Sequence, residues 1–209
     1  TFVTAMLNPK TIHDFYGFPK ELFEVKYPAP GSPELARETA ELLLPEIVEE
    51  DHSWGLDHGA WSVIRHLYPN AEMPVIQLSI GYNKPPQYHF DLAKKLQKLR
   101  EKGILIIGSG NIVHNLRMID WKNINTVGAG WDWAVEAREK TNNWLLDGNF
   151  QNLIDYQRQG VALQTAVPSP DHYLPLIYSL GLKEKSENLS LFNDELIGGS
   201  LSMTSVRIG

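Results

Sequence analysis

One histidine follows a strongly apolar run in the middle of the chain. Residues 104–107 are all Ile or Leu, and such a run predicts a strand buried on both faces. Residues 109–111 (Ser-Gly-Asn) suit a tight turn, and His114 comes just beyond them. Because ligands of open α/β sheets bind at the carboxyl ends of strands, His114 is a candidate for proton transfer. A histidine that only holds the loop through a nearby carbonyl is the alternative.

Two further segments place a histidine beside a predicted helix. His58 comes shortly before a helix predicted over residues 60–67, and a helix amino end favours anions, so His58 could bind a substrate oxygen. Packing of this aromatic-rich loop on the core is the alternative. Two prolines stiffen the approach to a helix expected near Asp171, which puts His172 in its first turn. A solvent-exposed histidine is the alternative there.

The remaining histidines carry weaker signals. His13 lies beside Asp14 in an aromatic segment with glycine and proline, where a local hydrogen bond is the simpler interpretation. His52 and His66 have the character of surface positions, and His89 that of a structural residue.

These histidines need a scaffold, and the pattern of elements predicts an α/β fold. Ser32 followed by Pro33 marks the start of one helix, and Pro45 ends it. The alternation indicates a single-domain sandwich with a central mixed sheet flanked by helices. Strands are predicted over 2–7, 47–50, 74–79, 104–107 and 201–208, and helices over 33–44, 60–67, 87–102, 131–146 and 150–158.

Composition narrows the class of protein. The length of 209 residues fits one domain, or at most two small ones. A net charge of −6 argues against nucleic acid as a partner, and no apolar stretch is long enough to span a membrane. The absence of cysteine excludes disulfides, thiolate metal ligands and a thiol nucleophile, and it fits a cytoplasmic location.

Three segments, taken together, resemble one enzyme family. Residues 56–61 (Leu-Asp-His-Gly-Ala-Trp), 109–116 (Ser-Gly-Asn-Ile-Val-His-Asn-Leu) and 170–175 (Pro-Asp-His-Tyr-Leu-Pro) resemble the class III extradiol ring-cleavage dioxygenases. The similarity is to the DOPA 4,5-dioxygenase branch, which residues 11–15, 27–33 and 199–203 also match. The resemblance covers essentially the whole chain, in order and with similar spacing.

The resemblance implies a mononuclear non-haem metal, Fe(II) in active members and Zn(II) as a further occupant. His172 corresponds to a metal ligand, and His114 to a ligand in this branch and to the acid/base residue of the wider superfamily. His58 and His13 correspond to active-site histidines around the substrate, where His58 would also stabilise developing oxygen anions. We expect His58, His114 and His172 to converge on one pocket.

The implied substrates are O2 and a small aromatic diol, a DOPA-like catechol, whose ring opens beside the diol. Two other classes stay open. A zinc hydrolase would use the same histidines to activate water. A non-catalytic binding protein would use an aromatic pocket near Trp54 and Trp61. The sequence leaves the oligomeric state open.

The chain also departs from the family. The family's first two metal histidines stand in a His-Gly-Ser-Pro motif and in a His-Trp pair, and neither motif occurs here. We therefore expect residues 1–209 to be an extradiol dioxygenase-like catalytic domain that lacks the family's amino-terminal segment. With only two ligands, this chain alone is expected to bind metal poorly and to show no ring cleavage.

Overall fold

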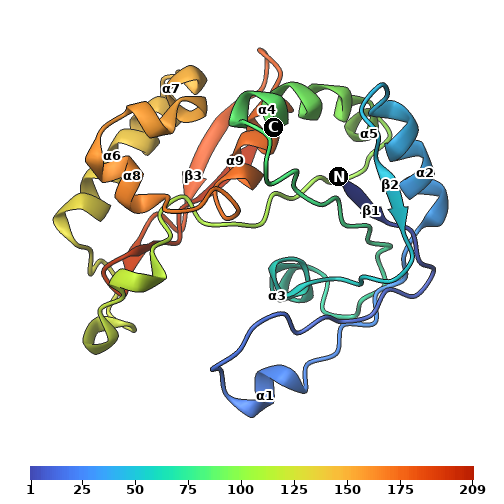
Figure 1. Ribbon diagram of the computed structural model, residues 1–209, viewed down its shortest axis with the longest axis horizontal. Helices are drawn as coiled ribbons and strands as arrows, with labels where there is room; N and C mark the ends of the chain where they lie inside the picture. The colour runs from blue at the N-terminus through green and yellow to red at the C-terminus, as the bar shows by residue number, and fades with distance from the viewer. The chain divides into compact units, whose positions relative to one another are not determined.

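The computed structural model describes residues 1–209 as a mixed α/β chain (Figure 1). It divides into two compact units: unit 1 is Thr1–Gly81 with Lys98–Gly103, and unit 2 is Tyr82–Gln97 with Ile104–Gly209. The predicted α/β class is confirmed. In place of one central sheet, the strands pair two by two in three separate two-stranded sheets. None of the helices has both the length and the apolar character needed to cross a membrane.

Unit 1 is built around a short parallel pair of strands covered by one helix. Strand β1 pairs with β2 in parallel, and α2 packs against both (Figure 1). The predicted start of α2 is confirmed, because the Ser32 side chain accepts a hydrogen bond from the backbone N–H of Leu35 and Pro33 is the first helical residue. The elements are β1 (Phe2–Thr4), α1 (Lys20–Phe23), α2 (Pro33–Leu42), β2 (Glu49–Asp51) and α3 (His58–Leu67), followed by α5 (Gln97–Glu101), all of which except Gln97 belongs to unit 1.

Two apolar clusters hold unit 1 together. One joins Val3 and Ala5 to Ala36 of α2. The other buries the inner face of α3, where Trp61 and Ile64 pack with Leu56 and neighbouring apolar residues. This second cluster fixes the position of α3, and therefore of the histidine with which α3 begins.

Unit 2 is mostly helical, and its helices pack in neighbouring pairs. Helices α4 and α9 lie side by side, and α6 packs against α8 (Figure 1). A Cβ on Gly181 of α9 would lie 2.3 Å from the carbonyl oxygen of Phe90 in α4, so only glycine permits this close approach. The elements are α4 (Pro86–Lys95), η1 (Leu116–Met118), η2 (Trp121–Asn123), α6 (Asp132–Leu146), α7 (Phe150–Ile154), η3 (Tyr156–Arg158), α8 (Val161–Ala166), α9 (Leu174–Gly181), β3 (Leu189–Phe192), β4 (Leu196–Ile197), β5 (Leu201–Ser202) and β6 (Ser205–Ile208).

The prediction of a buried strand over residues 104–107 is wrong. The segment is irregular, and Leu105 and Ile107 are 64% and 40% exposed. A strand requires a neighbouring backbone to accept and donate its hydrogen bonds, and none of the observed strands pairs with this segment. The apolar composition of residues 104–107 is compatible with a strand buried on both faces. Composition does not show, however, whether neighbouring strands are present to pair with it.

Other predicted elements differ in extent. The strand predicted over 2–7 ends at Thr4, and the helix predicted over 150–158 is α7 followed by the short 3-10 helix η3. Residues 74–79 run beside β1, where the Thr4 N–H donates to the Gln77 carbonyl oxygen at 2.9 Å, but they form only an isolated bridge. The helix predicted over 87–102 is interrupted at Leu96 into α4 and α5. The strand predicted over 201–208 divides into β5 and β6, because β5 pairs with β4 whereas β6 pairs with β3.

A charged network fastens α6 to the segment between β3 and β4. Arg138 of α6 donates from Nε to one carboxylate oxygen of Asp194 at 2.7 Å and from a terminal nitrogen to the other at 2.6 Å. Asn142 and Thr204 donate to the same carboxylate at 2.8 and 2.7 Å. Burial raises the pKa of Asp194, but the hydrogen bonds from these three side chains outweigh it and leave the pKa below its ordinary value.

We therefore expect Asp194→Ala to lower the free energy of unfolding by about 2 kcal/mol or more at neutral pH, since it leaves the Arg138 guanidinium without its partner. A depressed carboxyl pKa stabilises the fold above the unfolded-state pKa. This contribution begins to be lost below about pH 4, and it is gone once the pH falls below the lowered folded-state pKa. Urea unfolding at pH 7 and pH 3 measures both effects. The exposed Asp147 at the end of the same helix gives the control, Asp147→Ala. An equal loss of unfolding free energy in Asp194→Ala and Asp147→Ala would show that the hydrogen bonds of Asp194 do not stabilise the fold.

Candidate active site

The segment that carries His114 is held in unit 2 by backbone hydrogen bonds to three other segments. The His114 N–H donates to the carbonyl oxygen of Ala166 at the end of α8, at 2.9 Å. The Asn115 N–H donates to the Ser200 carbonyl oxygen at 3.2 Å, and the Asn111 N–H donates to the His172 carbonyl oxygen at 2.8 Å. These hydrogen bonds hold the loop in place although the strand predicted before it does not form.

The loop brings together two of the predicted site residues. The imidazole rings of His114 and His172 are stacked, with centroids 3.7 Å apart and planes inclined by 19°. Burial, and secondarily the neighbouring His172, lower the pKa of His114 to about 4. His114 is therefore neutral at pH 7, which is the form that can ligate a metal or accept a proton.

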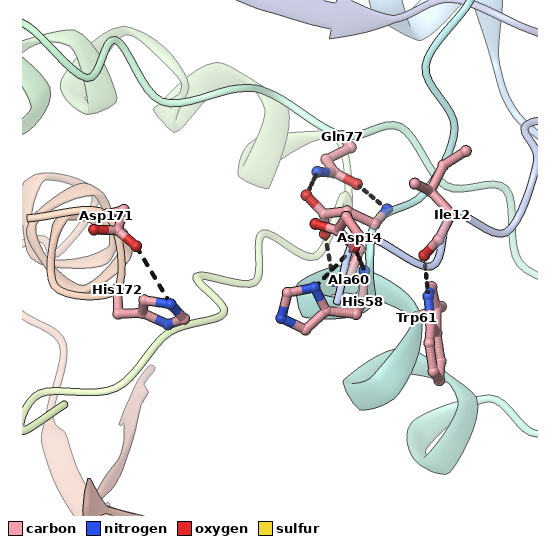
Figure 2. Close-up of polar contacts among 9 residues, drawn as sticks. Ile12, Asp14, His58, Ala60, Trp61, Gln77, Asp171 and His172 are labelled. Atoms are coloured by element: carbon pink, nitrogen blue, oxygen red, sulfur yellow. Dashed lines mark hydrogen bonds and ion pairs between the residues drawn. The ribbon is translucent and has the colours of Figure 1, made fainter. Parts of the chain in front are cut away.

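His172 lies before α9 and not in its first turn, which corrects the prediction. The helix begins at Leu174, with Tyr173 as its flanking residue and Pro175 at the tolerated start. Nε2 of His172 lies 3.3 Å from a carboxylate oxygen of Asp171 (Figure 2). The carboxylate nearest to the His172 ring therefore comes from Asp171, the preceding residue in the chain.

Gly110 allows the two histidine-bearing segments to approach each other. A Cβ at this position would lie 2.1 Å from the carbonyl oxygen of His172, well inside van der Waals contact. The obstructing atom belongs to the backbone, so it cannot move aside by a rotamer change.

Gly110→Ala is accordingly expected to cost about 2–3 kcal/mol in the free energy of unfolding and to separate His172 from His114. Thermal and chemical unfolding measure the loss. Gly148→Ala is the comparison variant, because Gly148 has open space around its Cα and only its φ of 69° makes alanine unfavourable, at about 1 kcal/mol. Equal losses in the two variants would show that the predicted clash is relieved without strain.

Unit 1 presents His58 at the first position of α3. Asp57 caps this helix, because its carboxylate accepts from the Ala60 N–H at 3.0 Å. The Asp57 carboxylate also accepts from the side-chain amide of Gln77, whose oxygen accepts from the Asp57 N–H at 3.0 Å (Figure 2). Asp14 accepts from both the backbone N–H and Nδ1 of His58, at 3.0 and 2.8 Å. The helix start is thus fixed from two directions.

His13 lies in the same unit, within a set of aromatic rings. Its Nε2 is 2.9 Å from the carbonyl oxygen of Val25, and its ring lies near those of Phe15, Phe23 and Trp61. Trp61 is only 2% exposed and donates from Nε1 to the Ile12 carbonyl oxygen at 2.9 Å. Trp61 therefore belongs to the core of unit 1, whereas Trp54, the other tryptophan of the binding-protein alternative, is 45% exposed.

Asp14 and Gln77 were not assigned any part in the site by the sequence. Asp14 is 44 positions away from His58, and no spacing rule connects residues at that distance. The one available signal was the His13-Asp14 pair, a carboxylate beside a candidate site histidine. The convergence of His58 with the His114–His172 pair stays a prediction.

A family model described as the catalytic LigB subunit of aromatic ring-opening dioxygenase matches residues 2–201. The chain therefore belongs to this family of ring-opening dioxygenases. The Escherichia coli protein named 4,5-DOPA dioxygenase extradiol is 44% identical over 214 residues, which cover 100% of this chain and 77% of that protein. The Beta vulgaris protein of the same name is 34% identical, covering 94% of this chain and 73% of that protein.

A solved structure of an uncharacterized Escherichia coli protein is also similar. It superposes with a TM-score of 0.82 at 37% sequence identity, covering 100% of this chain and 80% of that one. The fold of the chain is thus the fold of a known structure at substantial sequence identity.

Dioxygenases of this family are metal-dependent. His114 and His172 place two imidazole donors side by side, which is part of a donor set. No group of three or more His, Cys, Asp or Glu side chains that could hold a metal ion is formed in residues 1–209. Since stable zinc and iron sites use three or four protein ligands, these two side chains do not by themselves fit a complete metal site.

Proposed function

We propose that the protein that carries this sequence is an extradiol dioxygenase that opens the ring of a DOPA-like catechol beside its diol. The observation that carries the proposal is the 44% identity, over the whole chain, to a protein named 4,5-DOPA dioxygenase extradiol. The reaction inserts both atoms of O2: the O–O bond and one ring C–C bond break, O2 is reduced and the two ring carbons are oxidised. No further reductant is needed.

The roles of the histidines follow from their chemistry and setting. His114 is neutral at pH 7 and half-buried, so it can accept the proton that a catechol hydroxyl loses, or donate a lone pair to a metal. We assign His114 and His172 as metal ligands because they stand in the segments that resemble the family's motifs, and their adjacent rings are compatible with this assignment. His58 and His13 are assigned to the substrate, with His58 as a second catalytic histidine that stabilises developing charge on oxygen.

We propose Fe(II) as the metal that supports turnover, because oxygen chemistry requires a redox-active ion. Zn(II) accepts the same imidazole ligands but has no redox chemistry, so it would occupy the site without turnover. A zinc hydrolase, in contrast, would be active with Zn(II), which would activate a water molecule for hydrolysis, and it would consume no O2.

Oxygen uptake tests the proposal. The purified protein that carries this sequence, as distinct from residues 1–209 produced alone, is supplied with ferrous iron and a catechol such as DOPA. It is expected to consume O2 in equimolar amount with the catechol. The product should carry both atoms of isotopically labelled O2. Zinc in place of iron provides the control and should give no uptake. Hydrolysis of a test ester with zinc, together with no uptake with iron, would overturn the proposal.

A further inference from the structure

The contacts between Asp14 and His58 in unit 1 go beyond what a helix start requires. Asp57 already caps α3. One oxygen of Asp14 accepts two hydrogen bonds from the same residue, from the His58 backbone N–H at 3.0 Å and from its Nδ1 at 2.8 Å (Figure 2). The Phe15 ring meets the imidazole edge-on, with centroids 5.6 Å apart. Ring rotation is therefore restricted by a polar anchor and by an aromatic neighbour.

The Asp14 side chain is a carboxylate at neutral pH. Burial raises its pKa, but the hydrogen bonds from the backbone and the ring of His58 outweigh this effect and lower the pKa below the ordinary value. The amino end of α3 also favours a negative charge there. A carboxylate can only accept hydrogen bonds, so Nδ1 of His58 must carry the hydrogen. In the neutral ring, Nε2 is then the nitrogen with the lone pair.

His13 shows the opposite arrangement in the same unit. Its Nε2 lies 2.9 Å from the Val25 carbonyl oxygen, which also can only accept, so the hydrogen of His13 is on Nε2. The two histidines assigned to the substrate are therefore held in opposite tautomers. The difference comes from their partners, a charged carboxylate for His58 and a neutral carbonyl for His13.

We infer that Asp14 is a positioning residue that fixes His58 with hydrogen on Nδ1 and leaves Nε2 as a hydrogen-bond or proton acceptor for the catechol hydroxyl. The inference rests on the proposed function, because it concerns how His58 acts in that reaction. The side chains of His58 and Asp14 are 42% and 28% exposed, so the ring can meet a ligand while its carboxylate partner is partly shielded. Once His58 has taken a proton, Asp14 stabilises the imidazolium, and the new Nε2–H is the donor that can stabilise a developing oxygen anion.

The tautomer can be measured without any substrate. In long-range proton–nitrogen spectra of the chain labelled with nitrogen-15 histidine, recorded at about pH 8.5, where free imidazoles are neutral, His58 should carry hydrogen on Nδ1. In Asp14→Asn the amide can donate or accept, so hydrogen should also be seen on Nε2. Loss of a signal in His58→Asn identifies the residue. Hydrogen on Nε2 in the wild-type protein, or the same tautomer in both proteins, would overturn the inference.

Kinetics give the second readout. Asp14→Asn should lower kcat by about tenfold to a hundredfold with little change in KM, and Asp14→Glu should recover part of the loss. Asp51→Asn is the matched control, since Asp51 is a carboxylate of the same unit that accepts from the backbone N–H groups of Ser53 and Trp54 and from the Ser53 hydroxyl. Equal kcat in Asp14→Asn and Asp51→Asn would count against Asp14. These kinetics are measured on the protein that carries this sequence, not on residues 1–209 produced alone. If that protein consumed no O2, the proposed function would fail, and the spectra alone would decide the tautomer.

Discussion

In the protein that carries this sequence, turning over catechols as proposed, replacing His114 with alanine is expected to lower catechol turnover about a hundredfold or more, the loss typical of a removed acid/base group. The loop should keep its place in this variant, because its hydrogen bonds to Ala166, Ser200 and His172 use backbone atoms. A role confined to holding the loop would therefore give a small change. Oxygen uptake with ferrous iron in excess measures the effect.

His66→Ala is the control for this experiment, because His66 is exposed near the end of α3. Circular dichroism and thermal unfolding establish that both variants are folded. Turnover near the wild-type level in a folded His114→Ala protein would show that another residue carries the proton.

Burial gives His114 a property that distinguishes its two assigned roles. With a pKa of about 4, it is neutral throughout the neutral range, which suits a metal ligand, since ligation requires an unprotonated nitrogen. The same low pKa makes it a weak proton acceptor before substrate binds. The negative charge of a catecholate nearby would raise the pKa of the imidazole and so strengthen it as a base. A neutral imidazole has one lone pair, so a His114 that ligates a metal through it cannot accept a proton there at the same time. The two roles are therefore alternatives at any one moment, and both stay proposals.

Local signals in the sequence predicted the helices that have a clear start, but they missed α1 and α8 and the interruption between α4 and α5. Ser32 and Pro33 defined the start of α2, and the structure confirms both the cap and the proline position. The strands were predicted less well, because a strand depends on partners that local sequence does not identify. The run over residues 104–107 illustrates this: its composition fits a buried strand, but no neighbouring strand pairs with it. In contrast, β1 does find a partner, β2, more than forty residues away.

The candidate site was predictable where a motif carried it. His114 and His172 belong to separate motifs, and the structure stacks their rings. The residues that position the histidines were missed because their contacts are long-range: Gln77 contacts Asp57 across 20 positions, and Asp14 contacts His58 across 44. The sequence could suggest which side chains react, but the partners that set their tautomers emerge only from the fold.

Metal retention is the second large effect that we expect. In residues 1–209, His114 and His172 form an adjacent pair of donors, and no group of three or more ligand-type side chains surrounds them. Two imidazoles leave most of the coordination positions of an ion to water, so binding should be weak and exchange fast. The 209-residue chain, produced alone and dialysed, should thus retain far less than stoichiometric zinc or iron and show no ring cleavage.

Metal analysis after dialysis tests the prediction of weak binding, and two variants test whether any retained metal is bound by the His114–His172 pair. His172→Ala should remove the residual binding, because a single imidazole remains, whereas His52→Ala should not change it, since His52 is an exposed residue of unit 1 paired with Glu50. Stoichiometric metal that survives dialysis and is insensitive to His172→Ala would mean that the ligands lie elsewhere in the chain. Stoichiometric metal lost in His172→Ala would mean that further side chains join this pair when the ion binds. Either result would contradict the prediction of a weak two-histidine site, and the second would still place the metal at the His114–His172 pair.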